Sequence, residues 1–228
     1  LLREEEILKG STSICVSKFI AERMEALSLE SKSNLIHIPN GIDAKIFHPM
    51  KRSIDRDLLY FGRFQKVKGL DMLIAALNLL EKHGESPLLG IVGSFSQKER
   101  AFVLSLASDG VKKHIEFLGH IQHESVPNVL NSSKILVVPS RYESFSLPSL
   151  EAMACGNPII ASRVGGIPEL IDDVGGVLVE PGDANALAQG ISLSLKDDSL
   201  VDKALLLGPR KAARYDWEVV APMLGKLV

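Results

Sequence analysis

The stretch "ILVVPSRYESFSLPSLEAMACGNPIIAS" (residues 135–162) indicates a strand, a loop, a helix and a second strand, in that order. Its two apolar runs, at 135–138 and 159–161, are short and rich in β-branched residues, which is typical of buried strands. Proline is tolerated in the first turn of a helix and disfavours helical conformation in the residue before it. Pro148 therefore predicts a helix that begins near Leu147, with Ser146 as its cap, and leaves Glu143 in the loop.

The same alternation of strand and helix continues on both sides of this stretch. Further strand candidates are "NLIHIP" (34–39), "DLLYFG" (57–62), "LLGIVG" (88–93), "IEFLG" (115–119) and "GVLVEP" (176–181). The clearest helix is "GLDMLIAALNLLEKHG" (69–84), whose leucines recur on one face and whose last glycine offers a stop. Strands that alternate with helices predict an α/β fold, a doubly wound parallel sheet with helices on both faces.

Ligands of such sheets bind beyond the carboxyl ends of the strands. Four loops follow strand candidates, and they read "GRFQKVKG" (62–69), "GSFSQ" (93–97), "GHIQ" (119–122) and "SRYESFS" (140–146). We expect the functional residues in these loops.

The composition restricts the class of protein. The chain has 228 residues, 46% of them hydrophobic, with 26 Lys+Arg against 28 Asp+Glu and a formal net charge of -2. This charge shows no excess of the kind that nucleic-acid binders carry, so we expect no nucleic-acid partner. Cys15 and Cys155 lack a CxxC partner and the six histidines lack metal-ligand spacing, so we expect no metal and a reducing, cytoplasmic location. No apolar run is long enough for a membrane span, and the first residues lack the layout of a signal peptide.

Three regions differ in pattern. Residues 1–34 hold one strand candidate and one amphipathic helix candidate, "SKFIAERMEAL" (17–27), and begin with Leu rather than Met. We interpret them as the tail of a preceding domain and a hinge, and residues 35–213 as the main α/β domain. Residues 214–228 predict a helix that docks on the preceding domain through Trp217. A helix that lies on this domain's own core is an equally good interpretation.

The loop between the strand end at Gly62 and the helix start near Leu70 carries Arg63, Lys66 and Lys68. The planar donors of arginine and the compact charge of lysine suit a diphosphate, although a basic surface loop is a simpler explanation. Neither GxGxxG nor GxxxxGK[ST] is present, which disfavours a dinucleotide or P-loop site.

Glu143 and Glu151 flank the start of the helix near Leu147. The free N–H groups of Phe145, Ser146 and Leu147 would form an anion site there, while the two carboxylates could accept hydrogen bonds from sugar hydroxyls. The alternative is that each carboxylate only complements the helix dipole.

Several motifs in order resemble the retaining glycosyltransferases of group 1, family 4, which have the GT-B fold. The E-x7-E spacing from Glu143 to Glu151 precedes "EAMACGNPIIAS" and "GGIPE", while "IHIPNGIDAKIFHP" and "GRFQKVKGLDMLIAAL" resemble the family's domain entry and phosphate loop. The similarity covers about residues 12–220. It implies that this chain is the C-terminal, donor-binding Rossmann-like half of such an enzyme.

The resemblance implies a retaining hexosyltransferase that binds a nucleotide-diphospho-sugar, with UDP or GDP as the nucleotide, and needs no cofactor. Arg63 and Lys68 would hold the diphosphate and stabilise the leaving group without a metal, and Glu143 would contact the transferred sugar. Glu151 would bind the ribose, and Leu118 would border the base. The remaining implied donor contacts are Gly62, Gly93, Ser144, Phe145, Ser146 and Leu147.

The missing N-terminal domain would bind the acceptor, which is a saccharide, a lipid or a small molecule, as in polysaccharide biosynthesis. Peripheral association with the cytoplasmic membrane face stays open. Two departures from the family pattern are Ser146, where glycine is common, and "SFSQ" (94–97), where many members have a Gly-Pro turn. Two alternatives stay open as well: a non-catalytic sugar-nucleotide-binding module, and another GT-B enzyme such as an epimerase or a phosphorylase.

Overall fold

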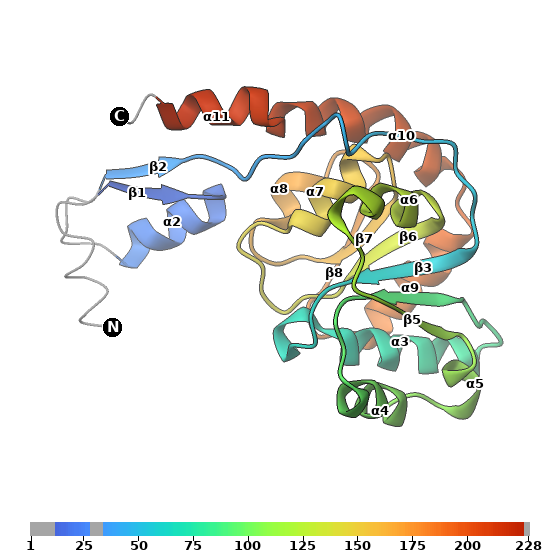
Figure 1. Ribbon diagram of the computed structural model, residues 1–228. Coiled ribbons are helices and arrows are strands. Elements are labelled where there is room, and N and C mark those ends of the chain that lie inside the picture. The colour runs from blue at the N-terminus through green and yellow to red at the C-terminus, as the bar shows by residue number, and fades with distance from the viewer. Residues whose placement is uncertain (1–11, 28–33, 226–228) are drawn as a thin grey trace.

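A computed structural model describes residues 12–27 and 34–225, and its centre is a six-stranded parallel sheet (Figure 1). The strands are β3 (Arg56–Phe61), β4 (Leu89–Val92), β5 (Ile115–Gly119), β6 (Ser133–Val138), β7 (Ile159–Ser162) and β8 (Gly176–Val179). They lie in the order β5-β4-β3-β6-β7-β8, which is the order of Rossmann-type nucleotide-binding sheets. The predicted doubly wound α/β fold is confirmed. The strand order reverses between β3 and β6, so the edge beyond these two strands is the expected ligand site.

Helices cover both faces of the sheet because successive strand residues point to opposite sides. Leu59, Leu136 and Ile159 pack in one core, under α6 (Val126–Asn131), α7 (Leu147–Ala154) and α8 (Ile167–Ile171). Leu58 and Ile135 pack in the other core. The helices on that side are α3 (Leu70–Lys82), α4 (Gln97–Ser105), α5 (Asp109–Lys112) and α9 (Ala184–Leu195).

The helix predicted from leucine spacing is α3. Its Leu70, Leu73, Leu77 and Leu80 are buried, as the 3.6-residue period requires. Gly84 follows the helix with φ +81°, and its N–H donates to the Glu81 carbonyl. The left-handed conformation of this glycine ends the helix where the sequence predicts.

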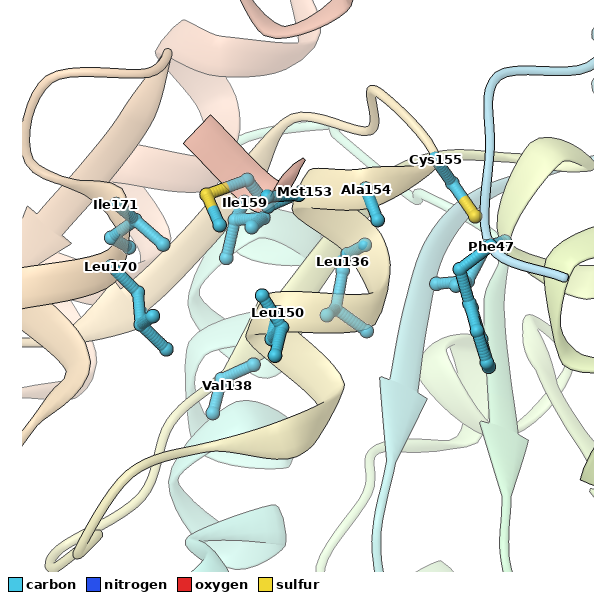
Figure 2. Close-up of a cluster of buried hydrophobic side chains, with 14 of the residues drawn as sticks. Phe47, Leu136, Val138, Leu150, Met153, Ala154, Cys155, Ile159, Leu170 and Ile171 are labelled. Carbon is cyan, nitrogen blue, oxygen red and sulfur yellow. The ribbon is translucent and has the colours of Figure 1, made fainter. Parts of the chain in front are cut away.

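The hydrophobic core beneath α7 fixes the position of this helix, which carries Glu151. Figure 2 shows Leu136 and Val138 of β6 close to Leu150 of α7, and Phe47 beside Cys155. Leu136, Leu150 and Cys155 have no exposed surface. Residues on this helix therefore have little freedom to shift relative to the sheet.

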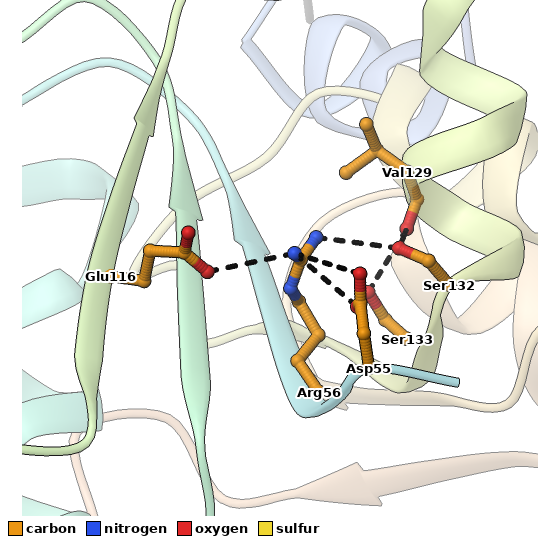
Figure 3. Close-up of polar contacts among 6 residues, drawn as sticks. All are labelled: Asp55, Arg56, Glu116, Val129, Ser132 and Ser133. Carbon is orange, nitrogen blue, oxygen red and sulfur yellow. Dashed lines mark hydrogen bonds and ion pairs between the residues drawn. The ribbon is translucent and has the colours of Figure 1, made fainter. Parts of the chain in front are cut away.

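A polar cluster ties the opposite, amino-terminal ends of the strands together (Figure 3). Arg56 donates to the Ser132 hydroxyl at 3.3 Å and lies 3.2 Å from Asp55 and 3.5 Å from Glu116. Its side chain also fills the space beside Gly90, where a Cβ atom would lie 2.7 Å from Arg56 Cδ. This cluster is far along the strands from their carboxyl ends, and we interpret it as structural.

A smaller unit precedes the sheet, with β1 (Thr12–Cys15), α2 (Lys18–Leu27) and β2 (Asn34–His37). β1 and β2 pair in parallel with each other, from Thr12 with Asn34 to Cys15 with His37, and not with the six-stranded sheet. The domain boundary that we predict at residue 35 therefore cuts through β2. Residues 1–11 and 28–33 of the predicted tail and hinge lie outside the described residues.

The chain ends in α10 (Ser199–Ala212) and α11 (Trp217–Gly225), which run toward the small unit (Figure 1). Residues 226–228 of the predicted C-terminal helix lie outside the described part. An isolated bridge joins Ile42 to Asp216, with Ile42 N–H donating to Tyr215 and Trp217 N–H donating to Ile42. The two segments that connect the small unit and α11 to the sheet are thus bonded to each other. No helix in the described residues has both the length and the apolar character that crossing a membrane requires.

Candidate functional site

The candidate site lies where the loops after β3 and β6 meet, and glycines allow this approach. Gly69 adopts φ +70°, and a Cβ atom there would lie 1.9 Å from the carbonyl oxygen of Pro139 in the loop after β6. Gly93 adopts φ +144°, and a Cβ atom there would lie 2.2 Å from the Gly62 carbonyl oxygen. A side chain at Gly69 would force the loops after β3 and β6 apart, and one at Gly93 would push the end of β4 away from the end of β3.

Lys68 and Glu143 meet across the two loops. The Lys68 ammonium lies 2.6 Å from Glu143 Oε1, and the Ser140 hydroxyl donates to the same oxygen at 3.1 Å. The Glu143 side chain is 10% exposed and that of Lys68 is 27% exposed. The Coulomb attraction in an ion pair so little exposed to water is stronger than in a surface pair. Because both charges are partly desolvated, each partner depends on the other for its charge balance.

Arg63 lies in the same loop as Lys68 and is exposed. Its guanidinium has no hydrogen-bond or ion-pair partner among the described residues. Lys66 is exposed as well, and the turn Lys66–Lys68 ends at Gly69, whose N–H donates to the Lys66 carbonyl. The loop therefore presents a free arginine beside the partly buried lysine.

Arg141 holds the two loops together, although its place in the sequence does not indicate this role. Its guanidinium donates to both carboxylate oxygens of Asp71, at 2.8 and 2.7 Å, and to the Lys66 carbonyl at 2.7 Å. Its backbone N–H donates to Val67. Hydrogen bonding by Arg141 lowers the pKa of Asp71. Since Asp71 stands four residues after Val67 but seventy before Arg141, no local pattern reveals this clamp.

The loop before α7 has an unusual backbone. Ser146 adopts φ +86°, and it is the only residue other than glycine with positive φ in the described chain. The predicted cap position is confirmed, since α7 begins at Leu147 and Ser146 is its N-cap residue. The Ser146 hydroxyl makes no cap hydrogen bond and instead lies 2.7 Å from the Ser149 hydroxyl.

The N–H groups of Phe145, Ser146 and Leu147 have no acceptor among the described residues. They belong to the start of α7, where the helix dipole is positive, next to the Lys68–Glu143 pair. Ser144 is exposed and Phe145 is buried against Tyr215. This loop can therefore bind an anion through its backbone, as the sequence predicts, and whether it does so stays a prediction.

Glu151 lies in the second turn of α7 and is mostly buried. Burial raises the pKa of its carboxyl to about 7, and no described side chain donates a hydrogen bond to it. Cys155 lies one turn further on the same face, and its pKa rises to about 12 through burial and through the charge of Glu151. Glu143 and Glu151 do not contact each other, and Glu151 has unused capacity to accept hydrogen bonds.

The other predicted contacts lie at the neighbouring strand ends. Leu118 is the residue before the last of β5, and its side chain packs back toward Gly90 in β4, beside Arg56, whereas Gly119 accepts a hydrogen bond from Gly93 N–H. Gly62 N–H donates to Val92, so the ends of β3, β4 and β5 adjoin one another. In residues 12–27 and 34–225, no three His, Cys, Asp or Glu side chains gather as metal ligands would.

Gly165 and Gly166 bring α8 against the Glu143 loop. A Cβ atom on Gly165 would lie 1.5 Å from the Glu143 carbonyl oxygen, which accepts a hydrogen bond from Gly166 N–H at 3.2 Å. Glu169 stands in the first turn of α8, where an acidic side chain complements the helix dipole. Its carboxylate, however, accepts from the backbone of Lys18 and Phe19 in α2. The sequence offers no signal for this contact across 150 positions.

A family model and a related protein both identify glycosyltransferases as the proteins that this chain resembles. The family model "Glycosyl transferases group 1" matches residues 42–205. An uncharacterized glycosyltransferase of Methanocaldococcus jannaschii is 32% identical over 207 residues, which are 90% of this chain and 55% of that protein.

Two solved structures have a similar fold. Sucrose-phosphate synthase from Thermosynechococcus elongatus superposes with a TM-score of 0.84 at 31% identity, over 99% of this chain and 60% of that one. Anabaena Alr3699/HepE, solved in complex with UDP and glucose, superposes with a TM-score of 0.76 at 21% identity, over 94% of this chain and 61% of that one. The chain spans about half the length of the curated relatives it matches.

Proposed function

The chain belongs to the group 1 glycosyl transferases, and we propose that its loops after β3 and β6 bind the nucleotide-diphospho-sugar donor. The observation that carries this proposal is the contact between Lys68 and Glu143 at the point where the strand order reverses. It joins a phosphate-binding type of side chain to a sugar-binding type. Glu143 shortly precedes the backbone N–H groups of residues 145–147, which have no acceptor among the described residues.

The diphosphate would lie between the basic loop and the start of α7. Arg63 is free to turn toward it, and Lys68 can contact a phosphate oxygen while it stays close to Glu143. The N–H groups of Phe145, Ser146 and Leu147 would bind the remaining oxygens. Negative charge grows on the leaving diphosphate as the glycosidic bond breaks, so these groups stabilise the transition state more than the bound donor.

The two carboxylates would hold opposite ends of the donor. Glu143, fixed by Lys68 and Ser140, would accept hydrogen bonds from hydroxyls of the transferred sugar. Glu151, which lacks a donor of its own, would accept from the ribose hydroxyls. Ser144 and the glycines Gly62 and Gly93 would line the donor, and Leu118 would border the base. A solved protein of similar fold contains UDP and glucose, which makes UDP the first nucleotide to test and GDP the second.

We propose that the sugar is transferred with retention of configuration. No described side chain at the site combines a nucleophile with an adjacent base, which fits attack by the acceptor on the face that the diphosphate leaves. Arg63 and Lys68 would supply the positive charge, so we expect transfer in excess EDTA to stay within about twofold of the untreated rate.

The acceptor would bind to a preceding domain. α11 supports this proposal, because Trp217, Val219, Met223 and Leu224 are between 37% and 48% exposed, which leaves an apolar surface for a neighbour. Trp217 already packs on Gly41, where a Cβ atom would lie 2.4 Å from the indole. A cytoplasmic location, with or without peripheral contact to the membrane, is part of this proposal.

A panel of nucleotide-sugars tests the proposal on the full-length protein. Thermal shift would identify the donor, and release of nucleoside diphosphate would report transfer or hydrolysis. We expect one UDP- or GDP-sugar to raise the Tm and to be consumed. A rise in Tm without any turnover would favour a non-catalytic binding module. No shift with any donor would contradict the proposal.

A further inference from the structure

We propose that Glu169 is a positioning residue that locks the start of α2 onto the loop of Glu143, so that this loop holds its donor-binding shape only while α2 is in place. This proposal rests on the proposed function. It adds a residue outside the donor contacts and a coupling between the small unit and the site.

The first turn of α2 is capped by residues from elsewhere in the chain. The Glu169 carboxylate accepts from Phe19 N–H at 2.8 Å and from Lys18 N–H at 3.1 Å. Ile20 N–H donates to the Ser17 hydroxyl, and Ala21 N–H donates to the Ser17 carbonyl. The N–H groups of residues 18–20, which a helix start leaves open, are thus bonded, two of them to Glu169, and Ala21 N–H makes the first regular helical bond.

Ser17 extends this cap to the donor loop. Its hydroxyl donates to the Ser144 carbonyl at 2.6 Å, and the residue is 1% exposed. Phe19 adds an edge-on ring contact with Tyr142, with centroids 6.2 Å apart. Residues 17–19 therefore contact the loop on both sides of Glu143.

The loop is enclosed from the other side by α8. Gly165 and Gly166 leave no room for a Cβ atom beside the carbonyls of Glu143 and Ser144, at 1.5 and 2.7 Å. A Cβ atom on Gly166 would also lie only 3.0 Å from Ser17 Cβ. The backbone of residues 143–144 is thus held between Ser17 and the start of α8, and Glu169 on α8 holds Ser17's helix in position.

The strained backbone explains why such a lock is needed. Ser146 has φ +86°, a conformation that strains a residue with a side chain and persists only where the surroundings impose it. Loss of the contacts to Ser144 removes one of those restraints. The backbone of residues 145–147, whose N–H groups form the proposed anion site, would then be freer to change its conformation.

The test compares Glu169→Ala and Glu169→Gln with Asp183→Ala in the full-length protein. Asp183 is a matched control, because its carboxylate also accepts two helix-start N–H groups, of Asn185 and Ala186, at 2.9 and 3.0 Å, but at the edge of the sheet. We expect Glu169→Ala to speed amide hydrogen exchange at residues 18–20 and also at Gly166 and Leu150, whose N–H groups donate to the Glu143 and Ser146 carbonyls of the loop. Glu169→Gln retains one acceptor and should give a smaller change. Asp183→Ala should speed exchange only at the start of α9.

UDP affinity adds a second readout. We expect Glu169→Ala to weaken UDP binding about fivefold or more, and Ser17→Ala to add little once Glu169 is gone, because both act through one lock. Faster exchange at residues 18–20 with no change at Gly166 and Leu150 would overturn the proposal and leave Glu169 as a helix cap. Unchanged UDP affinity in Glu169→Ala would overturn it too. A wild-type protein that binds no UDP would instead contradict the proposed function, while the exchange experiment would still test the lock.

Discussion

Lys68 Nζ lies 2.6 Å from Glu143 Oε1, although the two residues stand 75 positions apart and come from loops after different strands. The pair forms because β3 and β6 are neighbours in the sheet and Gly69 lets their loops touch. In the absence of a donor, each charge neutralises the other. A bound diphosphate would share Lys68 with Glu143.

The pair predicts separate effects on stability and on binding. Lys68→Ala leaves the Glu143 carboxylate buried without a cation, and we expect a loss of about 2 kcal/mol in the free energy of unfolding. Adding Glu143→Gln removes the unpaired charge, so the double variant should recover most of that loss but none of the UDP affinity. Urea unfolding followed by circular dichroism measures the first effect, and calorimetry the second. A double variant no more stable than Lys68→Ala would contradict this account of the pair.

Ser146 predicts a difference between two small substitutions. Ser146→Gly and Ser146→Ala both lose the contact with the Ser149 hydroxyl, but only glycine adopts φ +86° without strain. We expect the glycine variant to be more stable than the alanine variant by about 1 kcal/mol in chemical unfolding. Equal stability would show that the loop relaxes around alanine.

Glu151 predicts a dependence of stability on pH. Its raised pKa, about 7 against the usual 4.5, means that the folded protein binds this proton more tightly than the unfolded chain. The folded state is therefore favoured below pH 4.5, and stability falls as the pH rises from 4.5 through 7, by up to about 3 kcal/mol. Glu151→Gln should remove this fall in stability in unfolding experiments between pH 5 and pH 8, because the Glu151 carboxyl loses its proton in this range.

Glu151 also predicts proton release on binding. Ribose hydroxyls that donate to its carboxylate favour the charged form, so UDP binding near pH 7 should release a proton. Calorimetry in two buffers of different ionisation enthalpy measures this release. The Glu151→Gln variant is the control, since the phosphate of UDP titrates in both proteins. Equal proton release by wild type and variant would place the ribose elsewhere.

The Arg141 clamp predicts an indirect loss of affinity. Arg141→Lys replaces a planar fork by a single charge and loses the simultaneous bonds to Asp71 and Lys66, which hold the basic loop. We expect UDP affinity to fall about threefold to tenfold. Lys134→Ala breaks an ion pair with Asp57 at the opposite end of the sheet and should leave affinity unchanged. Equal effects of the two substitutions would contradict a local role for the clamp.

Much of this molecule was predictable from its sequence. The period of α3 and the short β-branched runs identify the elements, and Pro148 fixes the start of α7. The strand ends identify the loops of Lys68 and Glu143. What the sequence does not reveal is pairing at long range: β2 with β1, Arg141 with Asp71, and Glu169 with the start of α2. The left-handed backbone of Ser146 is not predictable either, because this conformation is typical of glycine and not of serine.

Calorimetric titration of the full-length protein with UDP and then GDP tests the central claim most directly. We expect one nucleotide to bind to the wild type and to Lys134→Ala, a residue that pairs with Asp57 at the opposite, amino-terminal end of the strands. Arg63→Ala and Lys68→Ala should each weaken that binding by about tenfold or more, because each removes a charged hydrogen-bond donor to the diphosphate. Absence of binding to either nucleotide, or equal affinity in all four proteins, would contradict a donor site at the loops after β3 and β6.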